Sequence, residues 1–396
     1  MQDGTPDRTA PDPAMPPPTD ISGRRPTHWS ATAIAGIPAQ TDAALPVIVA
    51  ADIVPVVPGH DVWDMWQIAY ADGRTALFGG RSWWFFLATP RFDDPEARHD
   101  AARIRLTSHG ADGWRDHGDT FADGFTPGSR EWSGSAVLAD DDVTLTLYFT
   151  AAGRRNGPHS FEQRLFETQG RFVRDGATAR TEGWTPPIES VAADDVYYAR
   201  ADQFEPVAGG IKGFRDPGYF RDPADGAEYL LFVGSAGWTD RLYDGVIGVA
   251  RRGPDGRWHP AAPLVTAIDV NRELERPHII VRDGRYYLFW STQGKRFAPG
   301  ITAPTGLYAM VADSLAGPWR PANGTGLVAA NPAAEPLQAY CWWVTHELDV
   351  ASFVDYWGLA GADPTNDVAL RRARFGGTAA PWFRLAVDGD RVTIQR

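Results

Sequence analysis

Residues 213–232 read GFRDPGYFRDPADGAEYLLF, a polar start followed by a β-like run, a turn and a second, strongly apolar run. The pattern recurs at four other places: DVWDMWQIAYADGRTALFGG (61–80), EWSGSAVLADDDVTLTLYF (131–149), ELERPHIIVRDGRYYLFW (273–290) and QAYCWWVTHELDVASFV (338–354). Between the first positions of the copies the intervals are 69, 83, 59 and 65 residues, measured from Asp64, Ser133, Asp216, Glu275 and Tyr340. Repeats at this period predict a radial β architecture with one blade per repeat.

The rest of the chain supports an all-β fold. Asp-Gly and Asn-Gly turn signals are dense, and helical periodicity is weak. The best helix candidate is short, DDPEARHDAARI (93–104), and we expect it to lie outside the sheet. The apolar segment 44–59 is cut by three prolines, which favours edge strands and a lead-in to the first blade. The sequence therefore predicts an all-β fold, a five-bladed β-propeller with a central funnel-shaped active site. We expect residues 26–396 to form this single catalytic domain and residues 1–25 to form a Pro-rich disordered tail.

Charge and composition exclude several function classes. The net charge of −12 argues against nucleic acid and against an anionic membrane surface as partners. No apolar run reaches the length of a membrane span, and the polar N-terminus does not resemble a secretory signal. The single Cys341 excludes an intramolecular disulfide, and its apolar surroundings predict a buried, inert thiol.

Three of the five repeats begin with a carboxylate: Asp64 in VWDMW, Asp216 in FRDPG and Glu275 in ELERPH. Taken singly, each would more often be a cap or turn residue. In a propeller, however, the first strand of each blade lines the axis, so equivalent positions converge. Close carboxylates repel, which raises the pKa of one of them and equips the site for glycoside chemistry by two carboxylates. The neighbouring Arg215 and Arg276 can hold a carboxylate ionised or bind substrate hydroxyls.

Over roughly residues 45–380, these motifs resemble the sucrose-acting fructosyltransferases, a family of levansucrases, inulosucrases and related bacterial β-fructofuranosidases. That family folds as a five-bladed propeller with a deep axial pocket. The resemblance implies Asp64 as nucleophile, Asp216 as transition-state stabiliser and Glu275 as acid/base. It implies that further residues line the sucrose pocket: Trp63, Trp132, Ser133, Arg215, Glu273, Arg276, Gln293 and Tyr340.

The implied mechanism is a retaining double displacement on sucrose. Asp64 attacks C2 of the fructosyl unit, Glu275 protonates the glycosidic oxygen, and glucose leaves a covalent fructosyl intermediate. Glu275 then activates a fructan, sucrose, another sugar or water as acceptor. This geometry predicts the Asp64 and Glu275 carboxyls about 5–5.5 Å apart. The resemblance also implies work outside the cytoplasm, in the periplasm or the extracellular space.

Two positions depart from the family pattern. Many Gram-positive members hold a structural calcium with an Asp directly before the residue that matches Glu273, and this chain has Arg272 there. A cation supplies no oxygen ligand and repels Ca²⁺, so we predict no calcium and no other cofactor. Polymerising relatives tend to place Arg or His near the position of Gln293. An uncharged residue there favours short fructo-oligosaccharides or plain hydrolysis over long levan.

Other functions compete with this hypothesis. A β-fructofuranosidase that mainly hydrolyses sucrose would share the same motifs. A non-catalytic carbohydrate-binding propeller would explain the repeats and the sixteen tryptophans, but not three carboxylates at blade starts. Another five-bladed glycosidase, acting on arabinan or xylan, would also use three carboxylates; the VWDMW, EWSGS and ELERPH strings favour sucrose.

Overall fold

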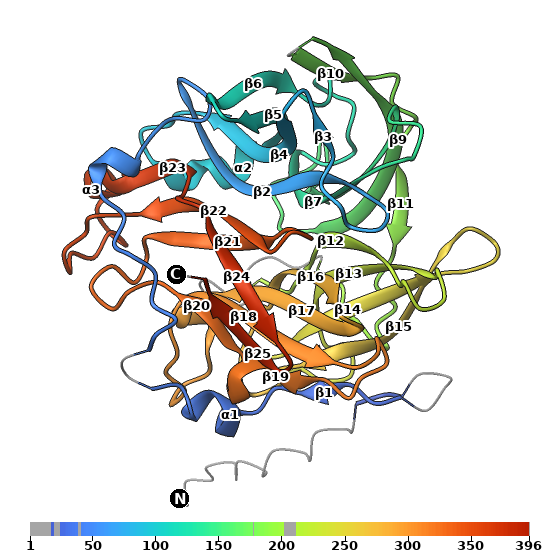
Figure 1. Ribbon diagram of the computed structural model, residues 1–396, viewed down its shortest axis with the longest axis vertical. Helices are drawn as coiled ribbons and strands as arrows, with labels where there is room; N and C mark the ends of the chain where they lie inside the picture. Colours follow the sequence, from blue (N-terminus) through green and yellow to red (C-terminus); the bar gives the residue numbers. More distant parts are fainter. Residues whose placement is uncertain (1–16, 20–23, 39–40, 177, 202–210, 396) are drawn as a thin grey trace, which may run out of the picture.

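The computed structural model describes residues 17–19, 24–38, 41–176, 178–201 and 211–395. Most of the predicted tail lies outside these residues. The strands of the protein form five blades around a common axis, which confirms the predicted all-β propeller. In Figure 1, blades 1 and 2 (blue to green) lie above blades 3 and 4 (yellow to orange), and the red blade 5 lies beside the start of blade 1.

The first two blades form one continuous sheet. Blade 1 contains β2 (His60–Tyr70), β3 (Leu77–Phe78), β4 (Arg81–Pro90), β5 (Arg103–Gly110) and β6 (Gly113–Asp119). Blade 2 contains β7 (Arg130–Leu138), β8 (Thr144–Ala152), β9 (Gln163–Asp175), β10 (Thr178–Glu182) and β11 (Ile188–Val191). Parallel pairing of β2 with β7 joins the two blades, since Ile68 pairs with Ala136 and Tyr70 with Leu138.

The remaining blades are separate sheets. Blade 3 contains β12 (Phe214–Arg221), β13 (Glu228–Ser235), β14 (Gly245–Arg252) and β15 (Trp258–Thr266), with β1 (Thr27–His28) added in parallel to β15. Blade 4 contains β16 (Glu275–Arg282), β17 (Arg285–Thr292), β18 (Gly306–Ala312), β19 (Arg320–Pro321) and β20 (Leu327–Ala330). Blade 5 contains β21 (Ala339–Val344), β22 (Asp349–Tyr356), β23 (Phe375–Ala379), β24 (Phe383–Asp388) and β25 (Arg391–Ile394).

Helices are short and lie outside the blades: α1 (Ala31–Ala35), η1 (Ala50–Asp52), η2 (Pro95–Ala97), α2 (Arg98–Ala101), η3 (Gly294–Arg296), η4 (Ala322–Gly324) and α3 (Val368–Arg374). Within the described residues, none is long and apolar enough to cross a membrane. The helix expected within 93–104 is confirmed as η2 and α2. The strands expected within 44–59 were wrong: the segment holds η1 and one isolated bridge, because its prolines remove ladder donors.

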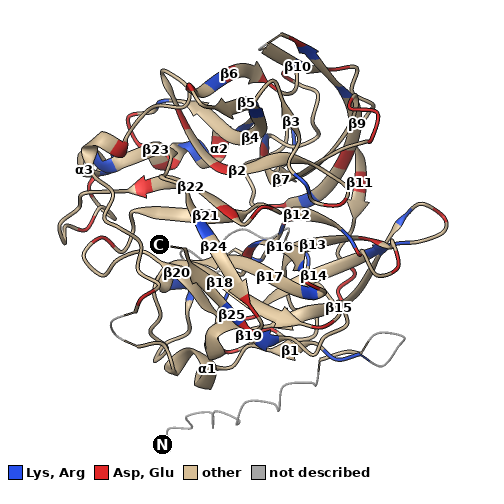
Figure 2. Ribbon diagram, viewed as in Figure 1, with Lys and Arg blue, Asp and Glu red and all other residues tan. Residues whose placement is uncertain are grey.

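Blades pack face to face, so their middle strands are covered on both sides. In β17, Leu288, Phe289 and Trp290 are consecutive, and all three are fully buried. This explains the continuous apolar runs in the second half of each repeat. Figure 2 shows acidic and basic residues interspersed along the ribbon rather than sorted to opposite sides.

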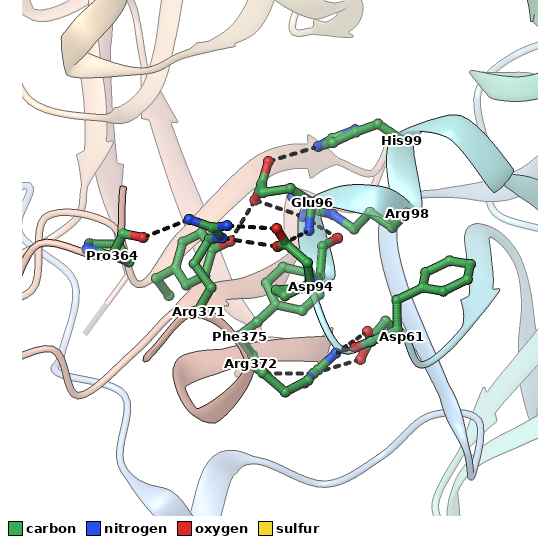
Figure 3. A network of polar contacts seen from close by, with 12 residues as sticks. Asp61, Asp94, Glu96, Arg98, His99, Pro364, Arg371, Arg372 and Phe375 are labelled. Carbon is green, nitrogen blue, oxygen red and sulfur yellow. Dashed lines mark hydrogen bonds and ion pairs between the residues drawn. The ribbon is translucent and has the colours of Figure 1, made fainter. Parts of the chain in front are cut away.

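Ion pairs help to close the ring between blade 5 and blade 1, where β2 packs against β22 and β23. The fully buried Asp61 of β2 accepts two hydrogen bonds from Arg372 of α3, at 2.6 and 3.0 Å. Asp94, which caps η2, is bound in the same two-pronged way by Arg371, at 2.9 and 2.6 Å. Figure 3 shows both pairs: the first fixes α3 to β2, and the second fixes α3 to the start of η2.

Candidate active site

Each inner strand is interrupted by a β-bulge, and the candidate site lies at these bulges. The ladder shifts after Trp63, Trp132, Arg215, Glu275 and Tyr340, in β2, β7, β12, β16 and β21 respectively. In four blades the bulge places two residues of the inner strand opposite one residue of the second strand. The first of the two bulge residues has a positive φ: Asp64 (42°), Asp216 (59°), Arg276 (58°) and Cys341 (54°). Bulges of this kind redirect side chains and are typical of functional sites.

The bulges correct our alignment of the repeats. Asp64 and Asp216 do share the bulge position, but its equivalents in blades 4 and 5 are Arg276 and Cys341. Glu275 and Tyr340 come one residue earlier, on the last paired residue before the bulge. We matched them by side-chain chemistry, and a repeat pattern in the sequence does not show where a bulge inserts its extra residue.

Asp216 is anchored from the neighbouring blade. Its Oδ1 accepts a hydrogen bond from the Ser133 hydroxyl at 2.6 Å, and its backbone N–H donates to Thr150 Oγ1 at 2.9 Å. Burial raises the pKa of Asp216 to about 6, against the opposing charges of Arg215 and Arg276. The EWSGS motif of blade 2 thus holds the FRDP carboxylate of blade 3.

Glu275 is joined to blades 3 and 5. Arg215 Nη2 donates to Oε1 at 2.6 Å, and the Tyr340 hydroxyl donates to Oε2. Burial works against ionisation, but the Arg215 charge and these two hydrogen bonds outweigh it and lower the pKa of Glu275. Arg215 also lies 3.8 Å from Asp216 and 3.5 Å from Glu273, so one guanidinium contacts three carboxylates.

Asp64 is half-buried in the bulge of β2. Burial raises its pKa against the charge of Arg276, and the negative charge of Glu275 adds to the rise. The electrostatic influence of Asp64 also reaches Asp216. The structure therefore brings together the three predicted carboxylates, from blades 1, 3 and 4, around Arg215 and Arg276.

Arg276 is almost fully buried, and its contact with the substrate stays a prediction. Its side chain is 1% exposed, its guanidinium lies 5.5 Å from the Trp66 ring and 5.0 Å from the Trp343 ring, and Nη2 donates to Met65 O at 2.8 Å. These contacts are typical of a buried cation behind the carboxylates. The neighbouring Cys341 is buried, as predicted, and burial raises the pKa of its thiol.

The other predicted residues surround this cluster. Trp63 is buried beside Asp64, and Trp132 is partly buried beside Ser133. Glu273 is 2% exposed and lies 2.8 Å from Arg296. Gln293 directly precedes η3, and its Oε1 is buried without a hydrogen-bond partner among the described residues.

Two residues that we did not predict lie beside Trp63, the residue before Asp64. His99 of α2 packs edge-on against the Trp63 ring, with ring centroids 6.2 Å apart, and its carbonyl accepts from Trp132 Nε1 at 3.2 Å. Glu96 of η2 lies 3.6 Å from the His99 ring. One feature of the sequence could have pointed to them: Glu96 and His99 lie three residues apart in a short helical stretch between two strands of blade 1.

A hollow of about 450 Å³ lies on the axis but away from this site. Its walls come from the inner strands beyond the bulges, including Gln67, Ser135, Tyr219, His278 and Trp343. None of the predicted site residues lines this hollow, so the hollow is not the candidate active site.

No group of three or more His, Cys, Asp or Glu suited to a metal ion occurs in the described residues. Arg272, at the position where a calcium ligand would precede Glu273, lies with its guanidinium 5.2 Å from the Tyr243 ring. The expectation that the protein works without calcium stays a prediction.

Comparisons with known proteins show the family to which the chain belongs. The family model described as Levansucrase/Invertase matches residues 19–245 and 240–396. The levansucrase LscA of Pseudomonas savastanoi pv. glycinea is 30% identical over 378 residues, which cover 84% of this chain and 86% of that protein. An inulosucrase from Halalkalicoccus jeotgali, solved bound to kestose, superposes with a TM-score of 0.85 at 37% identity over 93% of this chain and 95% of that one. A levansucrase structure from Gluconacetobacter diazotrophicus, 22% identical, shares the fold with a TM-score of 0.80 over 97% of this chain and 94% of that one.

Fold and site together define the class of propeller glycoside hydrolases with three convergent carboxylates. Within that class, the chain belongs to the levansucrase/invertase family, which our sequence analysis predicted from the motifs.

Proposed function

We propose that this protein cleaves sucrose as a retaining fructosyltransferase, with Asp64 as nucleophile, Asp216 as stabiliser and Glu275 as acid/base. One observation carries the proposal: Arg215 touches Glu275, Glu273 and Asp216 at once, which ties the acid/base candidate to the stabiliser candidate beside Asp64. The three carboxylates lie around only two buried cations, the guanidinium groups of Arg215 and Arg276. A state in which one of the three carboxylates keeps a proton is therefore lower in free energy than the state in which all three are ionised.

In the first step, the Asp64 carboxylate attacks C2 of the fructosyl unit, and the glycosidic C–O bond breaks as Glu275 gives its proton to the leaving oxygen. Glucose departs, and the fructosyl group is held as an ester on Asp64. Asp216, fixed by Ser133, faces the positive charge that develops on the sugar ring. In the second step, Glu275 takes a proton from the acceptor hydroxyl, whose oxygen replaces Asp64 on C2.

Glu275 must be protonated to act as an acid, yet Arg215 and Tyr340 favour its ionised form. We infer that a bound sugar has to share Arg215 before the first step proceeds. A guanidinium fork suits this, because it can donate to sugar hydroxyls and to a carboxylate at once. Free enzyme with protonated Glu275 is then the minority form at neutral pH.

The acceptor decides between transfer and hydrolysis. The inulosucrase relative bound to kestose supports sugar acceptors of short length. The uncharged Gln293 supports the same outcome. We therefore propose fructosyl transfer to sucrose and short fructans, with hydrolysis as a competing reaction, without a metal ion and outside the cytoplasm.

Incubation with sucrose tests the proposal. Glucose counts every cleavage event, whereas free fructose counts only hydrolysis. We expect more glucose than fructose, with the difference recovered as fructo-oligosaccharides, and we expect Asp64→Ala to abolish glucose release. Equal glucose and fructose at high sucrose would make the protein a β-fructofuranosidase, and undiminished glucose release from Asp64→Ala would refute the nucleophile.

A further inference from the structure

Two side chains beside the nucleophile have no part in the mechanism above. Glu96 and His99 lie in the connection from β4 to β5, in η2 and α2. Their side chains are 46% and 45% exposed, whereas Pro95 and Arg98 in the same connection are buried. The connection thus turns one carboxylate and one imidazole towards solvent.

Contacts place this exposed pair at the site. The His99 ring packs against Trp63, its carbonyl accepts from Trp132 Nε1, and the two tryptophans directly precede Asp64 and Ser133. The charges of His99 and Asp64 are close enough to influence each other. A sugar that approaches Asp64 from this side therefore meets His99, and Glu96 lies 3.6 Å from the His99 ring.

Glu96 is held by neighbouring side chains, and Figure 3 shows it in a network of polar contacts that also contains Arg98 and His99. Glu96 Oε1 accepts from Arg98 Nη1 at 3.0 Å and from the Tyr356 hydroxyl at 2.5 Å. Arg98 lies 4.3 Å from the Phe375 ring centroid, and the Asp94–Arg371 ion pair anchors the start of η2. Groups fixed in this way lose little conformational entropy when they bind a ligand.

The charge states suit a neutral polyol. The protein packed around His99 and the Arg98 charge lower the pKa of the imidazole. Burial works against ionisation of Glu96, but His99, Arg98 and Tyr356 outweigh it and lower the pKa of its carboxyl. At neutral pH the pair is a carboxylate, which only accepts, beside a neutral imidazole, whose Nε2 faces Glu96 Oε2 at 3.6 Å and whose other nitrogen accepts. Sugar hydroxyls offer the matching donors.

We propose that Glu96 and His99 bind the acceptor sugar beside the fructosyl intermediate and thereby set the ratio of transfer to hydrolysis. This rests on the proposed function, because an acceptor has meaning only if a fructosyl group is held on Asp64. The contact raises the share of sugar acceptors over water by holding a sugar hydroxyl near C2.

Product ratios from sucrose test this role, with glucose and free fructose followed separately in His99→Ala and Glu96→Gln. We expect the ratio of transferred to hydrolysed fructosyl groups to fall about three- to tenfold in each variant, the effect of one lost hydrogen bond. His259→Ala is the matched control. This His is also exposed and pairs with a carboxylate, Asp255, at 3.0 Å, but it lies in blade 3; its ratio should not change.

Unchanged product ratios in both variants would overturn the proposal. So would a fall in glucose release with an unchanged ratio, because that result would assign the pair to sucrose binding or to folding. If His99→Ala does not fold, the isosteric Glu96→Gln carries the test alone. Absence of glucose release from the unsubstituted protein would refute the proposed function itself, whereas glucose release with unchanged ratios refutes this inference only.

Discussion

Replacing Tyr340 with Phe should shift the pH dependence of sucrose cleavage. The Tyr340 hydroxyl donates to Glu275 Oε2, while Arg215 occupies Oε1. The substitution removes one donor and leaves the ring, which contacts Trp342 edge-on, in place. Because the hydrogen bond favours the ionised carboxylate, its loss raises the pKa of Glu275.

The size of the shift follows from the strength of that bond. A hydrogen bond to a charged group contributes about 1.5–3 kcal/mol, and 1.36 kcal/mol corresponds to one pKa unit, so the pKa of Glu275 should rise by roughly one to two units. Glu275 acts first as an acid. A higher pKa keeps it protonated to higher pH, so the basic limb of the kcat/KM profile should move upwards by the same amount.

Initial rates of glucose release at low sucrose, measured across the range in which carboxylates and histidines titrate, give this profile. Tyr286→Phe is the matched control, because the Tyr286 hydroxyl donates to the Asp222 carboxylate at 2.5 Å in another part of the fold. Its profile should match that of the unsubstituted protein. A basic limb that stays in place in folded Tyr340→Phe, or that moves downwards, would refute the assignment of Glu275 as the acid.

Two further predictions concern stability. Among the described residues, Arg372→Ala leaves the fully buried Asp61 with one ion-pair partner, Arg91 at 3.4 Å, and should cost about 3 kcal/mol in the free energy of unfolding by urea. Arg384→Ala, which breaks an exposed ion pair, should cost less than about 1 kcal/mol. Equal losses would contradict the role of the Asp61–Arg372 pair in joining blade 5 to blade 1. Burial raises the pKa of Asp355 to about 7, so the folded protein retains a proton that the unfolded chain releases, and stability should fall as pH rises from about 4 to about 7. Asp355→Asn should flatten that part of the melting-temperature profile, and an unchanged slope would exclude Asp355 as its source.

The repeats and motifs predicted the blades, the family and the three carboxylates because each signal is local. A polar residue, the strand that it begins, the following turn and the next strand lie within about twenty residues, the first part of each blade. Convergence in the propeller then follows from symmetry alone. The EWSGS string predicted Ser133 as a pocket residue, but its hydrogen bond to Asp216 became visible only in the structure.

The sequence could not show where the backbone departs from regular pairing. A two-for-one bulge moved the equivalent positions of blades 4 and 5 to Arg276 and Cys341, and it placed Arg276 behind the carboxylates. The sequence also could not pair Asp61 with Arg372, which is 311 positions away. His99 escaped notice because a short helical connection has no periodic signal and gains its meaning only from Trp63 and Trp132.

The central claim is that Asp64 carries the fructosyl group. Acid quenching during sucrose turnover, followed by proteolysis and mass spectrometry, should find a fructosyl ester on the peptide that contains VWDMW. Glu275→Gln, which slows both proton transfers, should be run beside it. An adduct confined to Asp64, absent from Asp64→Ala, is the predicted result; glucose release without any adduct there, or with the adduct on another residue, would contradict the account.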